Sequence, residues 1–131
     1  MKRFGLSKKE RIKQSKEIEK IYSVGKTCFA PSKKIKAIYL TEQSDCAVVK
    51  VAFAVSKRAG KAFWRNRVKR VLREAYRQNK SELLEIAASS GKSAFIIFSP
   101  VFLNQKKNSK VLLSDIERDV IFTLKKISGE L

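Results

Sequence analysis

The sequence contains no histidine, and it has only two cysteines among its 131 residues. Histidine is the side chain most often used as a general base or as a transition-metal ligand. Its absence therefore excludes Ser-His-Asp and Cys-His catalysis. The two cysteines, Cys28 and Cys46, have no C-x-x-C spacing and no histidine partners, so a zinc site is not expected. We expect both thiols to be reduced.

Long apolar runs are also missing. The longest have four or five residues, whereas roughly 20 are needed to cross a bilayer. The first residues, MKRFGLSKKERIKQSKE, lack the apolar segment of a secretory signal. With no repeat and no Pro/Gly-rich linker, residues 1–131 are expected to form a single domain with a flexible basic segment at 1–10. We expect a cytoplasmic protein without membrane contact.

Acidic residues are scarce, since 12 Asp and Glu face 30 Lys and Arg, and the net charge is +18. Residues 1–80 hold 23 of the basic and 6 of the acidic residues, whereas residues 81–131 hold 7 and 6. Self-repulsion of this size destabilises a compact chain unless a polyanion neutralises it. The distribution favours a nucleic-acid partner for the first three-fifths of the chain over lysines that serve only solubility.

Hydrophobic periodicity predicts four strands and three helices. The expected elements are, in order, a helix over 11–24 that ends at Gly25, two strands within 26–41, a strand over 48–56, a helix over 61–79, a strand over 93–99 and a helix that opens with a capping box at Ser114. Residues 81–88 could add a further helical turn or two. We predict an α+β two-layer sandwich of order α-β-β-β-α-β-α. Its strands at 48–56 and 93–99 are expected to form a split βαβ unit.

Apolar side chains mark the expected core of this fold. The strand over 48–56 is apolar on both faces, as expected at the centre of a sheet. Among the aromatic residues, Trp64, Phe95, Phe98 and Phe122 are expected to be buried.

The helix over 61–79 is the most informative element. Its apolar residues Trp64, Val68, Val71, Leu72 and Ala75 form one stripe at helical spacing. On a helical wheel the opposite face carries Asn66, Lys69, Arg70, Arg73 and Arg77, with Arg65 and Arg67 at the two borders. Cations on successive turns lie roughly 5–6 Å apart, which suits the repeating phosphates of a nucleic acid. Arginine binds phosphate oxygens bidentately, so the pattern favours nucleic-acid binding over a merely solvated face.

Two tyrosines are candidates for stacking on an unpaired base. Tyr22 and Tyr39 stand on elements rich in lysine, although half-buried tyrosines with hydrated hydroxyls would give the same pattern. Duplex DNA is a less suitable partner, because no helix-turn-helix spacing precedes the cationic helix. A sheet-and-helix platform is better suited to RNA.

The segment VAFAVSKRAGKAFWRNRVKRVLREAYR (51–77) resembles the signature of the bacterial ribonuclease P protein family. The core of the resemblance is Arg65-Asn66-Arg67, here called the RNR motif, followed by Lys69-Arg70 and Arg73-Glu74. Before it, Val55-Ser56-Lys57-Arg58 and Gly60 also match. The resemblance extends over most of the chain, and beyond Ser99 it rests on the order of the elements.

The resemblance implies a specific function. Proteins of this family are the small subunit of a ribonucleoprotein that removes the 5′ leader from precursor tRNA. The RNA subunit is the catalyst and holds Mg²⁺ ions that activate water. The resemblance further implies a ribosomal-protein-like fold with a left-handed βαβ crossover. It also implies no catalytic residue, no metal ligand and no organic cofactor in this chain, which agrees with the missing histidine.

The resemblance and the helical wheel together give two sets of candidate site residues. The residues expected to face the RNA subunit are Lys57, Arg58, Lys61, Arg65, Asn66, Arg67, Lys69, Arg70, Arg73 and Arg77. The single-stranded leader is expected in a cleft between the first helix and the sheet, at Ile18, Tyr22, Ala37 and Tyr39. Ile18 departs from the family, which commonly has Phe at this position.

Two other functions are alternatives to a ribonuclease P subunit. A ribosomal or other structural RNA-binding protein would share the basic surface. A metal-dependent nuclease acting without RNA would need clustered carboxylates, whereas Asp115, Glu117 and Asp119 are typical of a helix N-terminus. We expect ribonuclease P RNA and precursor tRNA as partners, and not DNA.

Overall fold

The computed structural model describes residues 10–12, 14–101 and 103–131. Its elements are α1 (Ser15–Val24), β1 (Lys26–Phe29), β2 (Ile35–Gln43), β3 (Val49–Phe53), the 3₁₀ turn η2 (Lys57–Ala59), α2 (Ala62–Asn79), α3 (Ser81–Ser90), β4 (Lys92–Pro100) and α4 (Leu113–Ser128). The expected flexible segment lies, except for Glu10, outside the described residues. None of the described helices is long and apolar enough to cross a membrane.

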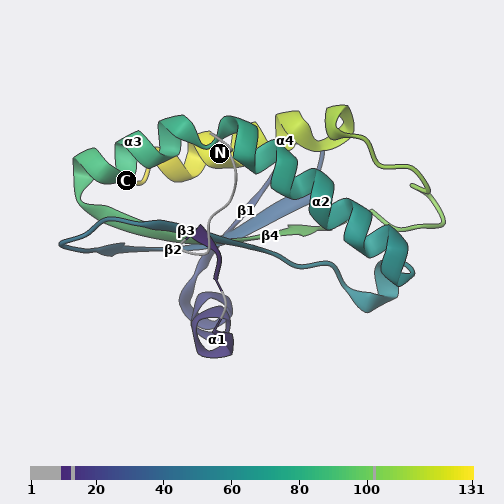
Figure 1. Ribbon diagram of the computed structural model, residues 1–131, viewed down its shortest axis with the longest axis horizontal. Coiled ribbons are helices and arrows are strands. Elements are labelled where there is room, and N and C mark those ends of the chain that lie inside the picture. Colours follow the sequence, from purple (N-terminus) through teal and green to yellow (C-terminus); the bar gives the residue numbers. More distant parts are fainter. Residues whose placement is uncertain (1–9, 13, 102) are drawn as a thin grey trace, which may run out of the picture.

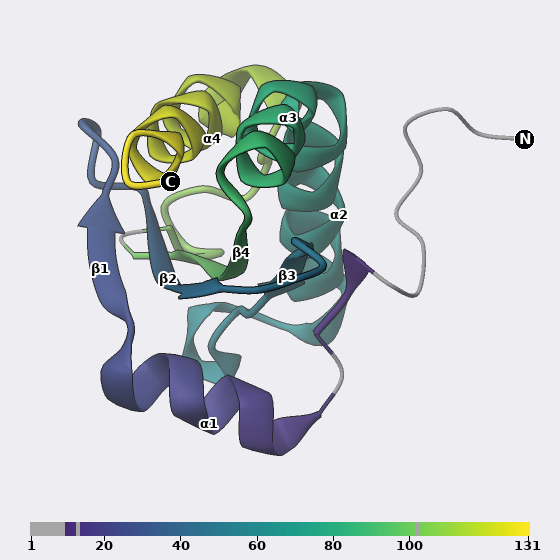
Figure 2. The same cartoon turned by 90° about the vertical axis from the view of Figure 1, so that its left-hand side faces the viewer.

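The predicted α+β class is confirmed, with a sheet that carries helices on both faces. Figures 1 and 2 show α2, α3 and α4 on one face and α1 across the other. The predicted two-layer sandwich therefore has a further partial layer, formed by α1. The described residues form four α-helices where three were predicted, because residues 81–90 form a helix of their own.

The sheet has the strand order β1-β2-β4-β3. β1 and β2 form an antiparallel hairpin, β2 pairs with β4 antiparallel, and β3 pairs with β4 in parallel. The prediction of a split βαβ unit is wrong, because β3 and β4 are direct neighbours with no strand between them. The expectation that the strand over 48–56 is central is also wrong, because β3 lies at an edge and β2 and β4 are the inner strands.

The edge strand β3 is apolar on both faces because both are covered. Val51 is buried among residues that pack against α2, whereas Ala52 packs on the other face with α1. The segment before α1 lies along the open edge, where the backbone N–H of Ile12 donates to the Val51 carbonyl at 2.9 Å. The Glu10 carboxylate pairs with buried Lys80 Nζ at 2.6 Å, which ties this segment to the junction of α2 and α3.

The helix ends follow local backbone chemistry. The predicted helix over 61–79 corresponds closely to α2. α3 follows directly, because Lys80 keeps right-handed helical angles, and it ends at Gly91, whose φ of 69° favours glycine. α4 begins one residue before the predicted Ser114. The Leu112 N–H before its first turn donates to Asp115 Oδ2 at 2.8 Å, so Asp115 and not Glu117 caps the helix.

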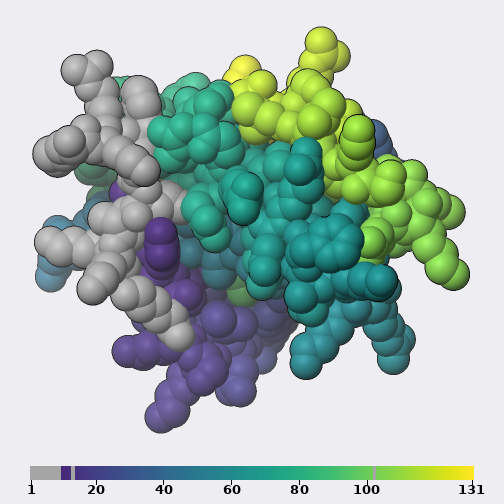
Figure 3. All heavy atoms as spheres, turned by 45° about the vertical axis from the view of Figure 1, so that its right-hand side comes forward, coloured from purple at the N-terminus to yellow at the C-terminus, as the bar shows by residue number. Residues whose placement is uncertain are grey.

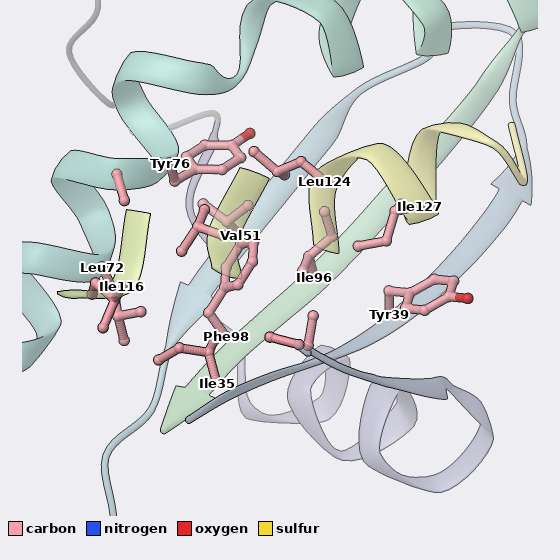
Figure 4. Packing of buried hydrophobic residues seen from close by; sticks show 14 of the residues in the cluster. Ile35, Tyr39, Val51, Leu72, Tyr76, Ile96, Phe98, Ile116, Leu124 and Ile127 are labelled. Carbon is pink, nitrogen blue, oxygen red and sulfur yellow. The ribbon is translucent and has the colours of Figure 1, made fainter. Parts of the chain in front are cut away.

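An aromatic cluster holds α2 against the sheet. The rings of Phe53 and Phe98 stack with centroids 5.8 Å apart, and Tyr76 of α2 lies 5.9 Å from Phe98. Figure 4 shows Tyr76 and Phe98 with Val51 and Leu72 between sheet and helix. Trp64 and Phe98 are buried as predicted, whereas Phe122 is 41% exposed on the outer side of α4. This packing fixes which side of α2 faces solvent.

The Tyr76 hydroxyl is buried, and it has no hydrogen-bond partner in the part of the chain that the structure describes. Burial, and secondarily the charge of Glu10, raise the pKa of Tyr76 above its ordinary value. Because the pKa of Tyr76 is higher in the folded than in the unfolded chain, the ionisation of this tyrosine does not affect folding below about pH 10. At higher pH the hydroxyl ionises more readily in the unfolded chain, and the free energy of unfolding falls.

We therefore expect Tyr76→Phe to raise the free energy of unfolding by about 1 kcal/mol at pH 7, because it removes an unpaired buried hydroxyl. The difference between the two proteins should widen above about pH 10, where only the wild-type chain has this tyrosine to ionise. Urea unfolding at pH 7 and pH 10.5 measures both effects. A loss of stability on substitution at pH 7 would contradict the assignment.

Candidate RNA interface

The buried stripe of α2 presents a cationic face to solvent. Trp64, Val68, Leu72, Ala75 and Tyr76 are buried. On the opposite side Asn66, Arg67, Arg70 and Arg73 are exposed, and Arg65, Lys69 and Arg77 are half-buried. Figure 3 shows α2, in teal, crossing the front of the molecule between α1 in purple and the yellow-green loop after β4. The structure thus brings the α2 members of the first predicted set onto one surface.

The two border arginines are held by backbone carbonyls. Arg65 Nε donates to the Gly60 carbonyl at 3.1 Å, and Arg67 Nε donates to the Val111 carbonyl at 3.4 Å. Each contact fixes the side chain near its guanidinium. A cation already held in place loses less conformational entropy when it binds a phosphate.

Arg77 differs from the other cations of this face. Its guanidinium donates to both carboxylate oxygens of Glu74 on the preceding turn, with 2.9 Å between Nε and Oε2. These hydrogen bonds raise the pKa of Arg77. The pair carries no net charge, so we expect the C-terminal end of α2 to attract phosphate less than its middle turns do.

The residues before α2 complete the cationic surface. The Ser56 hydroxyl accepts from the Arg58 backbone N–H at 3.2 Å and thereby starts the turn η2. Lys57, Arg58 and Lys61 are exposed beside this turn. Facing them is the loop between β4 and α4, whose Lys106 and Lys107 were not among the predicted site residues. The sequence could not indicate that these two lysines belong to the site, because the loop and η2 are far apart in the chain and meet only in the folded structure.

The predicted leader residues on β2 lie on the wrong face of the sheet. Ala37 is fully buried in the core cluster that contains the buried residues of α4. Tyr39 is 5% exposed and lies on the side of α4 with its hydroxyl on Glu130 (Figure 4). Side chains alternate along a strand, so the face toward α1 carries Lys36, Ile38 and Leu40 instead. The assignment of Ala37 and Tyr39 to the leader cleft is therefore wrong for this structure, because the register of β2 places them in the core.

The other two predicted leader residues stay accessible on α1. Ile18 is half-buried, and Tyr22 is 49% exposed. On one side of α1, Lys20 Nζ lies 2.7 Å from Glu42 Oε1. Tyr22 comes two residues later, which is a rotation of roughly 200° about the helix axis, so its ring projects to the opposite side of α1. On the neighbouring strand β1, Phe29, which sequence reasoning missed, is 53% exposed opposite Lys36.

A groove of about 330 Å³ joins α1 to the cationic helix. It is lined by Ile18 on one wall and by Lys69 and Arg73 of α2 on the other, with Phe53 and Arg11 between them. The groove connects the two sets of residues that the sequence assigned to different RNA segments. Arg11, which the sequence placed in the predicted helix over 11–24, forms a bridge to Val51 of β3 instead.

Metal-binding residues do not gather in the described part of the chain. No group of three His, Cys, Asp or Glu side chains lies there with the geometry to hold an ion. Cys28 and Cys46 are both free, and burial raises the pKa of the Cys28 thiol. The described residues therefore do not fit a Mg²⁺ ion held by the protein.

The model of the family described as Ribonuclease P matches residues 6–126. The chain belongs to the ribonuclease P protein family. It is 29% identical over 119 residues to the ribonuclease P protein component of Clostridium botulinum, covering 91% of this chain and 95% of that protein. It is 30% identical over 109 residues to the same component of Clostridioides difficile, with 83% of each covered.

The fold agrees with solved structures of the family. The ribonuclease P protein from Thermotoga maritima superposes with a TM-score of 0.70 at 20% identity, covering 89% of this chain and 96% of that one. The family match extends to residue 126 and includes most of α4, whereas beyond Ser99 the resemblance of the sequence rested on element order alone. Ribonuclease P membership therefore applies to nearly the whole chain and not only to the RNR motif.

Proposed function

We propose that this chain is the subunit of ribonuclease P that binds the catalytic RNA and guides the 5′ leader of precursor tRNA. The observation that carries the proposal is the exposed cationic face of α2. Its orientation is fixed by the buried stripe, and its border arginines are held by carbonyls. Such a face neutralises phosphates at little entropic cost.

In the proposed holoenzyme, this chain does not catalyse cleavage of the phosphodiester. The RNA subunit holds the Mg²⁺ ions and cleaves the phosphodiester, and the protein lowers the repulsion between the two RNAs. The +18 charge suits that role, because assembly brings the polyanionic RNA and a polyanionic substrate together.

The proposed leader path runs along the groove between α1 and α2. Lys69 and Arg73 supply cations on one wall, and Ile18 supplies an apolar surface on the other. Tyr22 stands on the same side of α1 as Ile18 and offers an exposed ring for a base. On the sheet, Lys36 takes the place that the sequence assigned to Ala37 and Tyr39.

Reconstitution tests the proposed function. The chain, added to bacterial ribonuclease P RNA and precursor tRNA at low Mg²⁺, should stimulate 5′ cleavage. Arg65→Ala combined with Arg67→Ala should weaken binding to the RNA subunit about 10- to 100-fold, since two charge-assisted contacts are lost. Thermal unfolding of the variant should stay close to wild type because Arg67 is exposed, Arg65 is only half-buried, and neither belongs to the buried stripe of α2. A wild-type chain that binds RNA without any stimulation would point to a structural RNA-binding protein instead.

Tyr22→Ala tests the leader path separately. Loss of one stacking surface, worth roughly 1–3 kcal/mol, should weaken holoenzyme binding to precursor tRNA about 5- to 150-fold. Binding of a tRNA substrate without a leader, and of the RNA subunit, should not change. Val24→Ala is a matched control, because Val24 is also exposed on α1 but has no aromatic ring. Equal effects on substrates with and without a leader would exclude Tyr22 from the path.

A further inference from the structure

A hollow of about 850 Å³ lies beside the N-terminal end of α2. One wall is residues 57–61, which include η2, and the other is residues 104–107 of the loop between β4 and α4. We call it the η2 hollow. Its volume is in the range of pockets that hold a molecule much larger than one phosphate group. Its second wall lies outside the segment that carries the RNR motif.

The loop wall of the η2 hollow is held in a fixed position. The indole Nε1 of Trp64 donates to the Asn108 carbonyl at 2.8 Å, and the backbone N–H of Gln105 donates to the Ala59 carbonyl at 2.8 Å. A Cβ on Gly60 would stand 2.8 Å from a Trp64 ring carbon and 2.9 Å from Gln105 Cβ. Only glycine therefore lets the loop approach this closely, and the hollow is preformed.

Four hydrogen-bond acceptors of the residues that line the hollow are occupied from within the protein. Two are backbone carbonyls and two are side-chain amide oxygens. The four bonds run from Gln105 N to Ala59 O (2.8 Å), from Arg65 Nε to Gly60 O (3.1 Å), from Lys107 N to Asn104 Oδ1 (2.9 Å) and from Lys61 N to Gln105 Oε1 (2.8 Å). What the two amides can still offer a ligand is their NH₂ groups, which are donors.

The charged groups of the hollow are all donors as well. Lys57, Arg58, Lys61, Lys106 and Lys107 line it, and none of the acidic residues in the described part of the chain does. Within the described ranges none of these five side chains forms an ion pair. A hollow with five cationic side chains, two amide NH₂ groups and uncompensated positive charge is complementary to a ligand made of anionic acceptors.

We propose that the η2 hollow binds the phosphate backbone of a second segment of the ribonuclease P RNA, in addition to the segment on the face of α2. The inference rests on the proposed function and extends its RNA contact to the loop, through Lys106 and Lys107. Lys61 immediately precedes α2, so the hollow is continuous with the surface of that helix. The groove between α1 and α2, which is the proposed path of the leader, begins at Lys69. Lys69 lies roughly 12 Å from Lys61 along the axis of α2, so we do not expect the leader in the η2 hollow.

The test removes the loop cations and leaves the RNR motif intact. Lys106→Ala with Lys107→Ala should weaken binding to ribonuclease P RNA about tenfold. It should also reduce the slope of log affinity against log salt by roughly 1.4–1.8, since each lost phosphate contact accounts for roughly 0.7–0.9. The matched control is Lys125→Ala with Lys126→Ala, two exposed lysines in the last turn of α4. The control should keep the wild-type slope.

A second variant tests the donor pattern itself. Gln105→Glu retains an oxygen for the Lys61 N–H but replaces the free NH₂ group by a carboxylate oxygen. It should weaken RNA binding at least as much as removal of one lysine, with no change in thermal unfolding. Lys106→Arg with Lys107→Arg should retain wild-type affinity because both charges remain.

The outcomes separate this inference from the proposed function. Wild-type affinity and slope in the Lys106/Lys107 variant would overturn the inference, whereas loss of binding in the Arg65/Arg67 variant would still support the proposed function. An effect confined to precursor tRNA with a leader would assign the hollow to the leader and also overturn it. Equal slope changes in the Lys125/Lys126 control would mean that the loop lysines act only through net charge.

Discussion

The affinity of this chain for ribonuclease P RNA is expected to fall about 10³- to 10⁵-fold as monovalent salt rises from roughly 50 to roughly 200 mM. The expectation follows from the number of cations on one surface. The face of α2 and the η2 hollow together present enough exposed Lys and Arg side chains to contact about 6–10 phosphates. Each contact releases condensed counterions, and that release is less favourable in concentrated salt.

Binding isotherms over a salt series measure this effect. Replacing chloride by another monovalent anion at the same ionic strength checks that the protein itself does not take up anions. Circular dichroism over the same series checks that the fold is unchanged. A nearly flat dependence on salt would exclude the cationic surface as the main contact and would favour base stacking or apolar packing.

Phe98→Ala is expected to lower the free energy of unfolding by about 3–5 kcal/mol. Phe98 is fully buried on an inner strand, where its ring meets Phe53 and Tyr76. Removing the ring leaves a cavity between β4, β3 and α2, and the surrounding strands can close it only in part. A loss of this size is a large fraction of the stability of an ordinary domain.

Urea unfolding measures the change, and Phe122→Ala is its control. Phe122 is 41% exposed on the outer side of α4, so its truncation should cost less than about 1 kcal/mol. Where the Phe98 variant is still folded, its affinity for RNA should be close to wild type, because no part of the ring reaches the interface. Similar losses for the two variants would contradict the placement of Phe98 in the core.

The helix α2 was predictable because its packing and its charge follow the same period. In α2 the buried stripe and the cations obey one 3.6-residue repeat, so the predicted 61–79 and the observed Ala62–Asn79 nearly coincide. The RNR motif on that helix could therefore be assigned to a surface from sequence alone. The loop of Lys106 and Lys107 could not, because its position depends on hydrogen bonds to Ala59 and from Trp64, far away in the chain.

The strands were less predictable, because the alternation of apolar and polar side chains did not show which face of each strand is buried. Along β2 both sets of alternating residues contain apolar side chains, so the sequence did not decide whether Tyr39 or Ile38 faces α4. Tertiary contacts decide it, since the Tyr39 hydroxyl meets Glu130 while Ile38 packs with Ile21 of α1. The same ambiguity affected β3, which is apolar on both faces because α1 and α2 cover it, even though it is an edge strand.

The indole of Trp64 supplies an intrinsic spectroscopic reporter of this surface. It is the one tryptophan in the sequence, it is 1% exposed, and its N–H is bonded to the loop at Asn108. Release of the loop would expose the ring to water and shift its fluorescence emission to longer wavelength. Unlabelled protein can therefore report, in a cuvette, whether the loop stays docked while RNA binds.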